Sequence, residues 1–408
     1  MRACLLFFFL LSFSAYTRAQ PATAEDLLGS WADLSSNGFT PRGAFTTCVV
    51  GGKIYAIGGF NGQSYINRLE VFDPSTNSWD TVATTGTFTP RRGLCSVAID
   101  GKIYTFGGAN ATGALNTVEI FDPVSKAWSA PMMSGTYTPR WRSAAVFLNN
   151  RVFVLGGYDM NNGVLNTLEV FDPTTNEWST PVTSGTLTPR SDLTATIIGG
   201  KIYAIGGQGN ASLPSPEVFD PTTKTWSVPT VTGTFTQRQG LCAAVIDGKI
   251  YTFGGFDGFS YLNTFELFDP VSNMWTSPST SGTLHGSAGL CGALCGGRVY
   301  VMGGRDGTGF LNMNEVFTPA QSSVSLFPSR GSIAVYPNPT DGRVTIQAGS
   351  ESPLHITITN LLGQVLVTED IEQHPLNSTV DLSSLPNGAY PIRIRTGTSE
   401  IEEMLLKQ

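Results

Sequence analysis

Residues 30–320 consist of short apolar runs separated by turn-forming residues. In the first such unit, one run follows Arg42, two more cover residues 53–57 and 69–72, and a fourth surrounds Trp79. Gly, Asp and Pro are concentrated between the runs. Runs of this length between such turns are typical of antiparallel strands joined by hairpins. The pattern therefore predicts four short strands in this unit and no long helices.

The four-strand unit recurs along the chain with a period of 48 to 50 residues, measured between successive Gly-Gly pairs. These pairs stand at 58–59, 107–108, 156–157, 206–207, 254–255 and 303–304. Each unit also has an aromatic residue three places before its pair, and a Glu two places before a Phe downstream. A Trp recurs with the same period, at Trp31, Trp79, Trp128, Trp178, Trp226 and Trp275. Four-stranded units repeated at this interval are typical of β-propeller blades.

The order of these residues also predicts how the propeller closes. Trp31 precedes the first Gly-Gly pair, whereas no Trp follows the sixth pair. The strand near Trp31 is therefore expected to be the outer strand of the last unit, which contains Gly303 and Gly304. Pairing the two ends of the repeat region removes the open sheet edges that favour aggregation. We predict an all-β fold whose main domain is a six-bladed β-propeller.

The Gly-Gly pairs, the preceding aromatic residues and the trailing Trp residues together resemble the kelch family of β-propellers. The resemblance covers roughly residues 30–320. A WD40 propeller is disfavoured, since Gly-His signatures are missing and Trp79-Asp80 is the only Trp-Asp pair.

The two ends of the chain have a different organisation from the repeats. Residues 1–19 contain Arg2 and an apolar run over 5–13, which predicts a signal peptide. The propeller is expected over residues 20–319 and a linker over 320–331. The remaining segment, 332–408, has alternating apolar runs at 343–346, 356–358 and 390–394 that predict a small Ig-like β-sandwich.

This last segment resembles the C-terminal sorting domain of the bacterial type IX secretion system. Three motifs carry the resemblance in order: Tyr-Pro-Asn-Pro at 336–339, Leu-Leu-Gly-Gln-Val at 361–365 and Leu-Pro-Asn-Gly-Ala-Tyr at 385–390. The resemblance implies a Bacteroidetes-type bacterium and recognition of the tail by the type IX machinery. It also implies removal of the tail, and a product that is secreted or held at the outer cell surface.

Composition excludes several classes of partner. The formal charge is −7, only 13% of residues are charged, and Lys and Arg are dispersed along the chain. Nucleic-acid binding needs a concentrated basic surface, so we expect none here. No stretch after residue 19 is apolar enough to span a bilayer, and we expect no transmembrane anchor.

We expect no metal or other cofactor. Cys48, Cys95, Cys242, Cys291 and Cys295 all fall in the first strand of their units. They can be interpreted as thiols around a central channel or as small buried side chains, and the second interpretation is favoured. His285 is the only propeller histidine, which argues against the copper site of galactose oxidase. The Asp-boxes of six-bladed sialidases are absent as well.

A repeated arginine opens the first strand in five units, at Arg42, Arg91, Arg140, Arg190 and Arg238, whereas Ser287 takes the sixth place. A ring of arginines could bind anions. The equally regular Glu of the third strand instead favours structural ion pairs within each blade, because a binding site rarely needs the same group from every blade.

Departures from the repeat are better candidates for a ligand site. Loops between the second and third strands, and between successive units, are expected at one end of the propeller. Aromatic, Arg and Asp side chains on these loops could stack on and hydrogen-bond a saccharide or peptide. The candidates are Trp141, Arg142, Tyr158, Asp159, Asp257, Tyr261, Arg305, Asp306 and Phe310.

The sequence therefore favours a non-catalytic binding protein, secreted or at the cell surface, whose propeller face holds a glycan or protein partner. One alternative is an extracytoplasmic carbohydrate-active enzyme of the sialic-acid mutarotase type, drawing on Arg140, Arg190, Asp159 or His285. A purely structural surface-layer component is a further alternative.

Overall fold

The computed structural model describes residues 28–320 except 210–212, 214 and 215. In the C-terminal part it describes 333–336, 340, 342–348, 354–360, 364–371, 377–395 and 400–407. The predicted signal peptide, most of the linker and part of the Tyr-Pro-Asn-Pro and Leu-Leu-Gly motifs lie outside these residues. The chain divides into two compact units, Met1–Ala320 and Gln321–Gln408.

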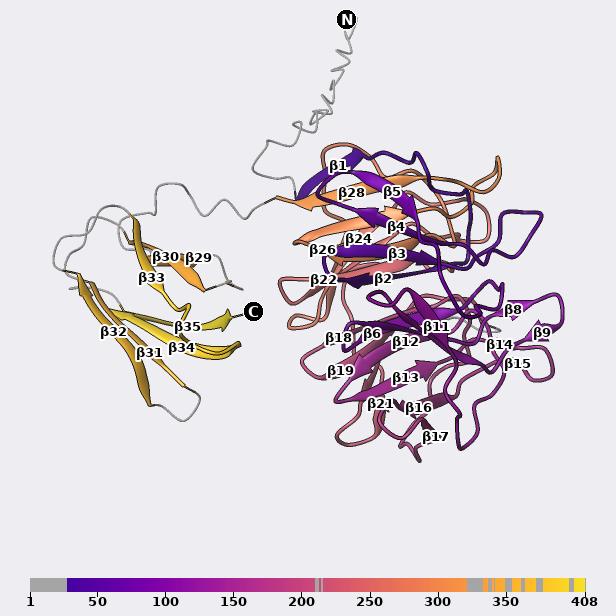
Figure 1. Cartoon of the computed structure of the whole chain (residues 1–408), viewed down its shortest axis with the longest axis horizontal. Helices are drawn as coiled ribbons and strands as arrows, with labels where there is room; N and C mark the ends of the chain where they lie inside the picture. Colours follow the sequence, from indigo (N-terminus) through magenta and orange to yellow (C-terminus); the bar gives the residue numbers. More distant parts are fainter. Residues whose placement is uncertain are drawn as a thin grey trace, which may run out of the picture. The chain divides into compact units, whose positions relative to one another are not determined.

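The first unit contains six four-stranded antiparallel sheets, numbered here 1 to 6 in chain order (Figure 1). Sheet 1 comprises β2 (Thr46–Val50), β3 (Lys53–Ile57), β4 (Leu69–Asp73) and β5 (Ser78–Thr81). Sheet 2 comprises β6 (Cys95–Ile99), β7 (Lys102–Phe106), β10 (Val118–Asp122) and β11 (Ala127–Ser129). Sheet 3 comprises β12 (Ala144–Leu148), β13 (Arg151–Leu155), β16 (Leu168–Asp172) and β17 (Glu177–Ser179).

The other three sheets repeat this arrangement. Sheet 4 comprises β18 (Thr194–Ile198), β19 (Lys201–Ile205), β20 (Glu217–Asp220) and β21 (Thr225–Ser227). Sheet 5 comprises β22 (Cys242–Ile246), β23 (Lys249–Phe253), β24 (Phe265–Asp269) and β25 (Met274–Thr276). Sheet 6 comprises β26 (Cys291–Cys295), β27 (Arg298–Met302), β28 (Asn314–Pro319) and β1 (Gly29–Asp33). Two small hairpins extend loops of sheets 2 and 3, namely β8 (Ala109–Asn110) with β9 (Gly113–Ala114), and β14 (Tyr158–Asp159) with β15 (Gly163–Val164).

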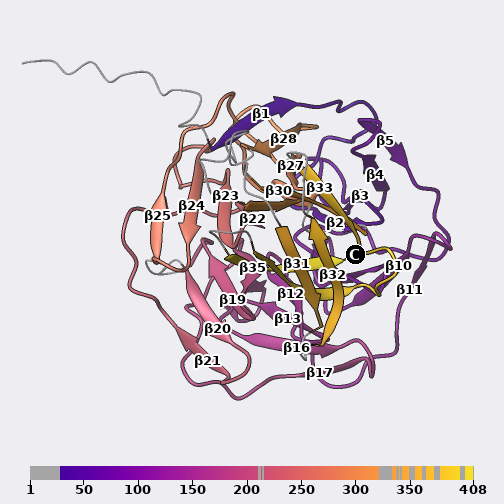
Figure 2. The ribbon, with the colours of Figure 1, turned by 90° about the vertical axis from the view of Figure 1, so that its left-hand side faces the viewer.

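The six sheets surround a common centre, and their first strands lie innermost (Figure 2). Each innermost strand contacts those of both neighbouring sheets, and β26 of sheet 6 contacts β2 of sheet 1. The N-terminal strand β1 pairs with β28, so that Trp31 lies opposite Phe317. Trp31 also packs edge-on against Phe253 and Phe265 of sheet 5.

The hydrophobic core of this unit lies between neighbouring sheets. Phe72 and Trp79 of sheet 1, for example, pack in one cluster with Tyr300 and Met302 of sheet 6. The repeated Phe of each third strand and the repeated Trp of each outer strand fill the same layer in every pair of sheets. The sequence repeat therefore becomes a repeated interface between sheets.

The second unit has two antiparallel sheets. One contains β29 (Ile333–Tyr336), β30 (Arg343–Ala348) and β33 (Asn377–Asp381). The other contains β32 (Val365–Ile371), β31 (Leu354–Thr359), β34 (Gly388–Arg395) and β35 (Glu400–Lys407). Side chains from both sheets, such as Val344, Ile346, Ile356 and Ile392, form one buried core. The unit is thus a two-layer β structure.

Candidate functional site

The repeated arginines are buried in ion pairs within their own sheets. Arg42 pairs with Glu70, and both side chains are fully buried. The same pair recurs as Arg91–Glu119, Arg140–Glu169, Arg190–Glu217 and Arg238–Glu266. In each case the glutamate also accepts a hydrogen bond from a threonine hydroxyl, at 2.6 Å from Thr40 to Glu70. A buried charge is tolerated when it is paired and hydrogen-bonded in this way. These arginines therefore hold the loops in place and are not available to a ligand.

Sheet 6 lacks this pair. Ser287 stands where the other five sheets have arginine, and His285 stands where they have threonine. Glu315 remains, 5% exposed, and among the described residues its carboxylate accepts the backbone N–H of His285 alone, at 3.2 and 3.1 Å from its two oxygens. Burial raises the pKa of the Glu315 carboxyl. Sheet 6 thus keeps a buried carboxylate with no arginine beside it.

The Gly-Gly pairs allow neighbouring sheets to approach closely at one end of the ring. The N–H of the second glycine donates to the carbonyl of the residue that opens the next sheet, for example Gly59 to Arg91 at 2.8 Å. A Cβ on Gly107, the first glycine of its pair, would lie 2.5 Å from the Arg140 carbonyl oxygen, and its φ is +57°. Only glycine satisfies both requirements.

A second set of backbone hydrogen bonds forms a complete ring at the same end. We call the repeated arginine of each unit, and Ser287 in sheet 6, the sheet-opening residue. The residue two places after it donates its N–H to the carbonyl of the equivalent residue in the preceding sheet, with N···O distances of 2.6–2.9 Å. In order around the ring these residues are Ala44, Gly93, Arg142, Asp192, Gly240 and Gly289, and all have positive φ. We call them the floor ring, because a cavity lies on each side of them.

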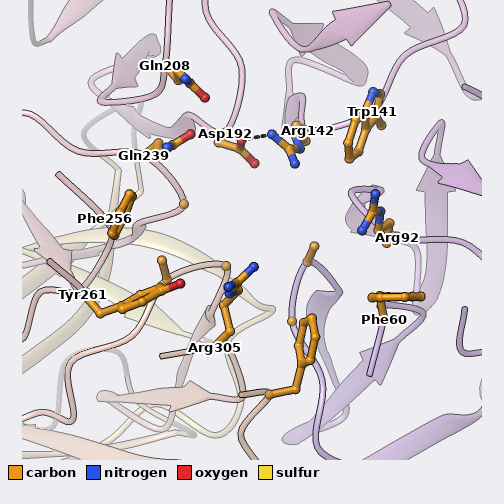
Figure 3. Close-up of a pocket in the computed structure, with 16 residues that line it drawn as sticks. Phe60, Arg92, Trp141, Arg142, Asp192, Gln208, Gln239, Phe256, Tyr261 and Arg305 are labelled. Carbon is orange, nitrogen blue, oxygen red and sulfur yellow. Dashed lines mark hydrogen bonds and ion pairs between the residues drawn. The ribbon is translucent and has the colours of Figure 1, made fainter. Parts of the chain in front are cut away.

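The larger cavity, about 450 Å³, opens at the end that carries both predicted loop sets, and we call it the cup. Loops entering the innermost strands contribute Arg92, Trp141 and Gln239, together with floor-ring residues (Figure 3). Loops that follow the Gly-Gly pairs contribute Phe60, Gln208, Phe256, Tyr261, Arg305 and Phe310. Because consecutive strands are antiparallel, these two kinds of loop emerge at the same end of every sheet.

Aromatic rings support the two cup arginines that form no ion pair among the described residues, Arg92 and Arg305. The Arg92 guanidinium lies 5.1 Å from the ring centroids of both Phe60 and Trp141, between the two side chains (Figure 3). Arg305 lies 5.8 Å from Tyr261 and 5.9 Å from Phe310. Such contacts hold a guanidinium in place without neutralising its charge. Neither arginine forms an ion pair with any residue in the described part of the chain.

Two donors in the cup wall also have no acceptor among the described residues. They are Nε of Arg92 and Nε1 of Trp141, and both atoms are buried. A buried donor without an acceptor is costly.

The third arginine is neutralised within the protein. Arg142 pairs with Asp192 at 2.9 Å on the floor ring and stacks on Trp141, with its guanidinium 4.0 Å from the indole centroid. Burial raises the pKa of Asp192, although Arg142 acts in the opposite direction. The charged residues of the cup lining are thus three arginines and one aspartate.

The structure brings together five of the nine residues proposed from the sequence. Trp141, Arg142, Tyr261, Arg305 and Phe310 line the cup.

The other four proposed residues shape its loops. Tyr158 lies behind the wall, edge-on to Trp141 at 6.1 Å. Asp159 is buried and accepts hydrogen bonds from Asn161 and Asn162. Asp257 accepts the N–H groups of Phe259 and Ser260. Asp306 accepts the Thr308 N–H at 2.7 Å and pairs with His285 at 3.0 Å.

Sequence reasoning missed Phe60, Arg92, Asp192, Gln208, Gln239 and Phe256. A signal for them exists in the repeat. All six occupy one of three positions: directly after the Gly-Gly pair, or one or two places after the sheet-opening residue. These positions vary from unit to unit, while the residues that flank them recur. Comparing the six units position by position would have found them.

The smaller cavity, about 250 Å³, lies along the innermost strands on the other side of the floor ring. Cys95, Cys242 and Cys291 line it. Burial raises the pKa of Cys95 to about 11 and that of Cys242 to about 12. These groups therefore remain neutral thiols at physiological pH. The described residues include no group of three or more His, Cys, Asp or Glu side chains placed to hold a metal ion.

The described part of the chain contains no helix long and apolar enough to cross a membrane.

Two family models match the chain. The KLHDC2/KLHL20/DRC7 Kelch-repeats domain matches residues 28–207 and 193–347. The Secretion system C-terminal sorting domain matches residues 334–408. The kelch match covers the described sheets of the first unit and runs on to residue 347, and the sorting-domain match lies within the second unit.

Individual relatives match over short segments. The chain is 36% identical to Kelch-like protein 4 of Homo sapiens over 50 residues, which is 12% of this chain and 7% of that protein. It is 48% identical to an F-box/kelch-repeat protein of Arabidopsis thaliana over 42 residues, which is 10% of this chain and 11% of that protein. The chain thus spans about a tenth of the length of these relatives.

Proposed function

The chain belongs to the kelch-repeat family and ends in a type IX sorting domain, and from this premise we propose that it is an exported, non-catalytic binding protein. In this proposal, residues 1–19 are a signal peptide and residues 20–319 form a closed six-bladed propeller. Residues 320–331 link it to an Ig-like sorting domain, 332–408, that is removed during export. The propeller works outside the cell or at its surface.

The cup is the proposed binding site, and one observation carries this proposal. Arg92 and Arg305 line the cup, neither has an acidic partner among the residues that the structure describes, and both are backed by aromatic rings. Guanidinium groups held in this way recognise carboxylates, phosphates or sulfates through charge-assisted hydrogen bonds. The aromatic faces of the cup provide stacking surface for a sugar ring or an apolar side chain. We therefore expect the partner, a glycan or a protein, to insert an anionic group.

The test is a binding screen of the secreted chain against acidic and neutral glycans and against extracellular proteins. Arg92→Ala, Arg305→Ala and Trp141→Ala are compared with Lys126→Ala. Lys126 is exposed and does not line the cup, and the change removes one positive charge just as the arginine variants do. Loss of a charge-assisted contact should weaken binding about 10-fold to 100-fold.

A partner whose binding is lowered by the cup variants and not by Lys126→Ala supports the proposal. A partner that is indifferent to all three cup variants places the site elsewhere. If the partner is an acidic sugar, the rate at which its anomers interconvert should be measured. Acceleration by the protein would favour the mutarotase alternative over non-catalytic binding.

A further inference from the structure

Arg142 and Asp192 occupy positions of the floor ring that other sheets fill with small residues. Sheets 2, 5 and 6 have glycine there, and sheet 1 has alanine. The φ angles of Arg142 and Asp192 are 59° and 54°, in the region where side chains other than those of Asn and Asp are disfavoured. A charged pair placed where the backbone favours glycine suggests a role beyond folding.

The two side chains are held against each other from several directions. Their backbones are joined by the floor-ring hydrogen bond from Asp192 N–H to the Arg142 carbonyl, at 2.8 Å. Their side chains are partly exposed, 34% for Arg142 and 21% for Asp192, and both residues line the smaller cavity as well as the cup. Arg142 also stacks on Trp141, so its position does not depend on Asp192 alone.

Asp192 is the only acidic residue among those lining the cup. The charged groups that act on it are Arg142, in contact, and Arg92, through space. Arg305 lies across the cup, and the neighbouring lining residues Gln208 and Gln239 are neutral. With Asp192 ionised, the cup therefore has two arginines free of an acidic partner. With Asp192 neutral it has three.

We propose that Asp192 is an internal counter-ion that occupies Arg142 in the empty cup and thereby determines how strongly the cup attracts anions. This inference rests on the proposed function, because it concerns the regulation of the same site. An anionic ligand that reaches Arg142 must displace the Asp192 carboxylate. Acidification also frees Arg142, without any ligand, because a protonated Asp192 carboxyl no longer forms an ion pair with the guanidinium. Burial, which disfavours the ionised form of Asp192, brings this change closer to physiological pH.

The test uses sodium sulfate as the probe, because sulfate keeps its charge while a carboxyl group with a raised pKa takes up its proton. Its dissociation constant is measured by calorimetry for the full secreted chain at intervals from about pH 7 down to about pH 4, close to the ordinary pKa of an aspartate. Asp192→Asn removes the charge and keeps a side chain that tolerates positive φ. Asp80→Asn is the matched control, because Asp80 is exposed on β5 and does not line the cup.

Asp192→Asn should bind sulfate about fivefold more tightly than the unchanged protein near neutral pH, from the loss of one opposing charge at close range. Affinity of the unchanged protein and of Asp80→Asn should rise on acidification, whereas that of Asp192→Asn should stay flat. Sulfate binding that is lost in Arg92→Ala but equal in Asp192→Asn overturns this inference and leaves the proposed function standing. Binding that is absent, or indifferent to Arg92→Ala and Arg305→Ala, overturns both. Weaker binding in Asp192→Asn assigns Asp192 to the ligand site itself and also overturns the inference.

Discussion

Replacing Arg42 by methionine tests whether the repeated arginines stabilise the ring of sheets or merely fit in it. Arg42 and Glu70 are both fully buried. The arginine also donates to the carbonyls of Thr40 and Gly58, at 3.2 and 3.1 Å. Methionine keeps most of the apolar length of the side chain and removes the charge and the donors. Glu70 is then left in the core with the N–H and hydroxyl of Thr40 and with Arg68, an exposed side chain 3.6 Å from its other carboxylate oxygen.

The free energy of unfolding should fall by about 3–5 kcal/mol, which is the range observed when one partner of a buried ion pair is removed. The cause is the uncompensated carboxylate more than the lost attraction. Arg42→Met with Glu70→Gln should therefore recover part of the loss, since a neutral amide is cheaper to bury than a charge. For a unit of this size the single variant should lower the melting temperature by about 5–8 °C.

Denaturant unfolding followed by tryptophan fluorescence is the assay. All seven tryptophans lie between residues 31 and 275, so the signal reports on the repeat unit and not on the C-terminal unit. A loss below about 1 kcal/mol for Arg42→Met would contradict the structural role assigned to these arginines.

Two further predictions follow from the same contacts. The double variant Ser287→Arg, Met313→Thr should stabilise the protein, because it gives Glu315 the same neighbours that Glu119 has in sheet 2. These are an arginine partner and a threonine two residues before the glutamate. No gain in melting temperature would mean that sheet 6 has no room for the pair. Gly107→Ala should destabilise the protein by several kcal/mol, since its Cβ would meet the Arg140 carbonyl at 2.5 Å, whereas Gly51→Ala, also at positive φ but with nothing within 4 Å, should cost only about 1 kcal/mol. Equal effects of the two glycine substitutions in thermal unfolding would refute the close-approach explanation.

The sequence determined the β-strands, because the apolar runs and turn residues that predict a strand are local, and in the propeller they are repeated six times. Residues 53–57 were predicted as a strand and form β3, and the alternating segments at 343–346, 356–358 and 390–394 lie within β30, β31 and β34. The family and the export route were also readable, since both rest on short motifs in a fixed order. The regular spacing of Arg and Glu was enough to favour a structural ion pair, which the structure shows in five sheets.

The cup was only half visible in the sequence. Trp141, Tyr261 and Arg305 were conspicuous as departures from the repeat, but Asp159, Asp257 and Asp306 were equally conspicuous and are used to hold loops. Whether a loop aspartate faces a ligand or accepts its neighbours' N–H groups is decided by the turn it sits in, which sequence spacing does not specify.

Only the tertiary structure could decide which side chains meet. Arg142 and Asp192 are 50 residues apart in the chain, and Arg92 and Phe60 belong to different sheets. They come together because the floor ring places equivalent residues of all six repeats around one centre. A pattern within one repeat does not say which side chains of the other repeats will lie beside it. The sequence thus determined what each sheet is made of, and the closure of the sheets around one centre determined what the cup contains.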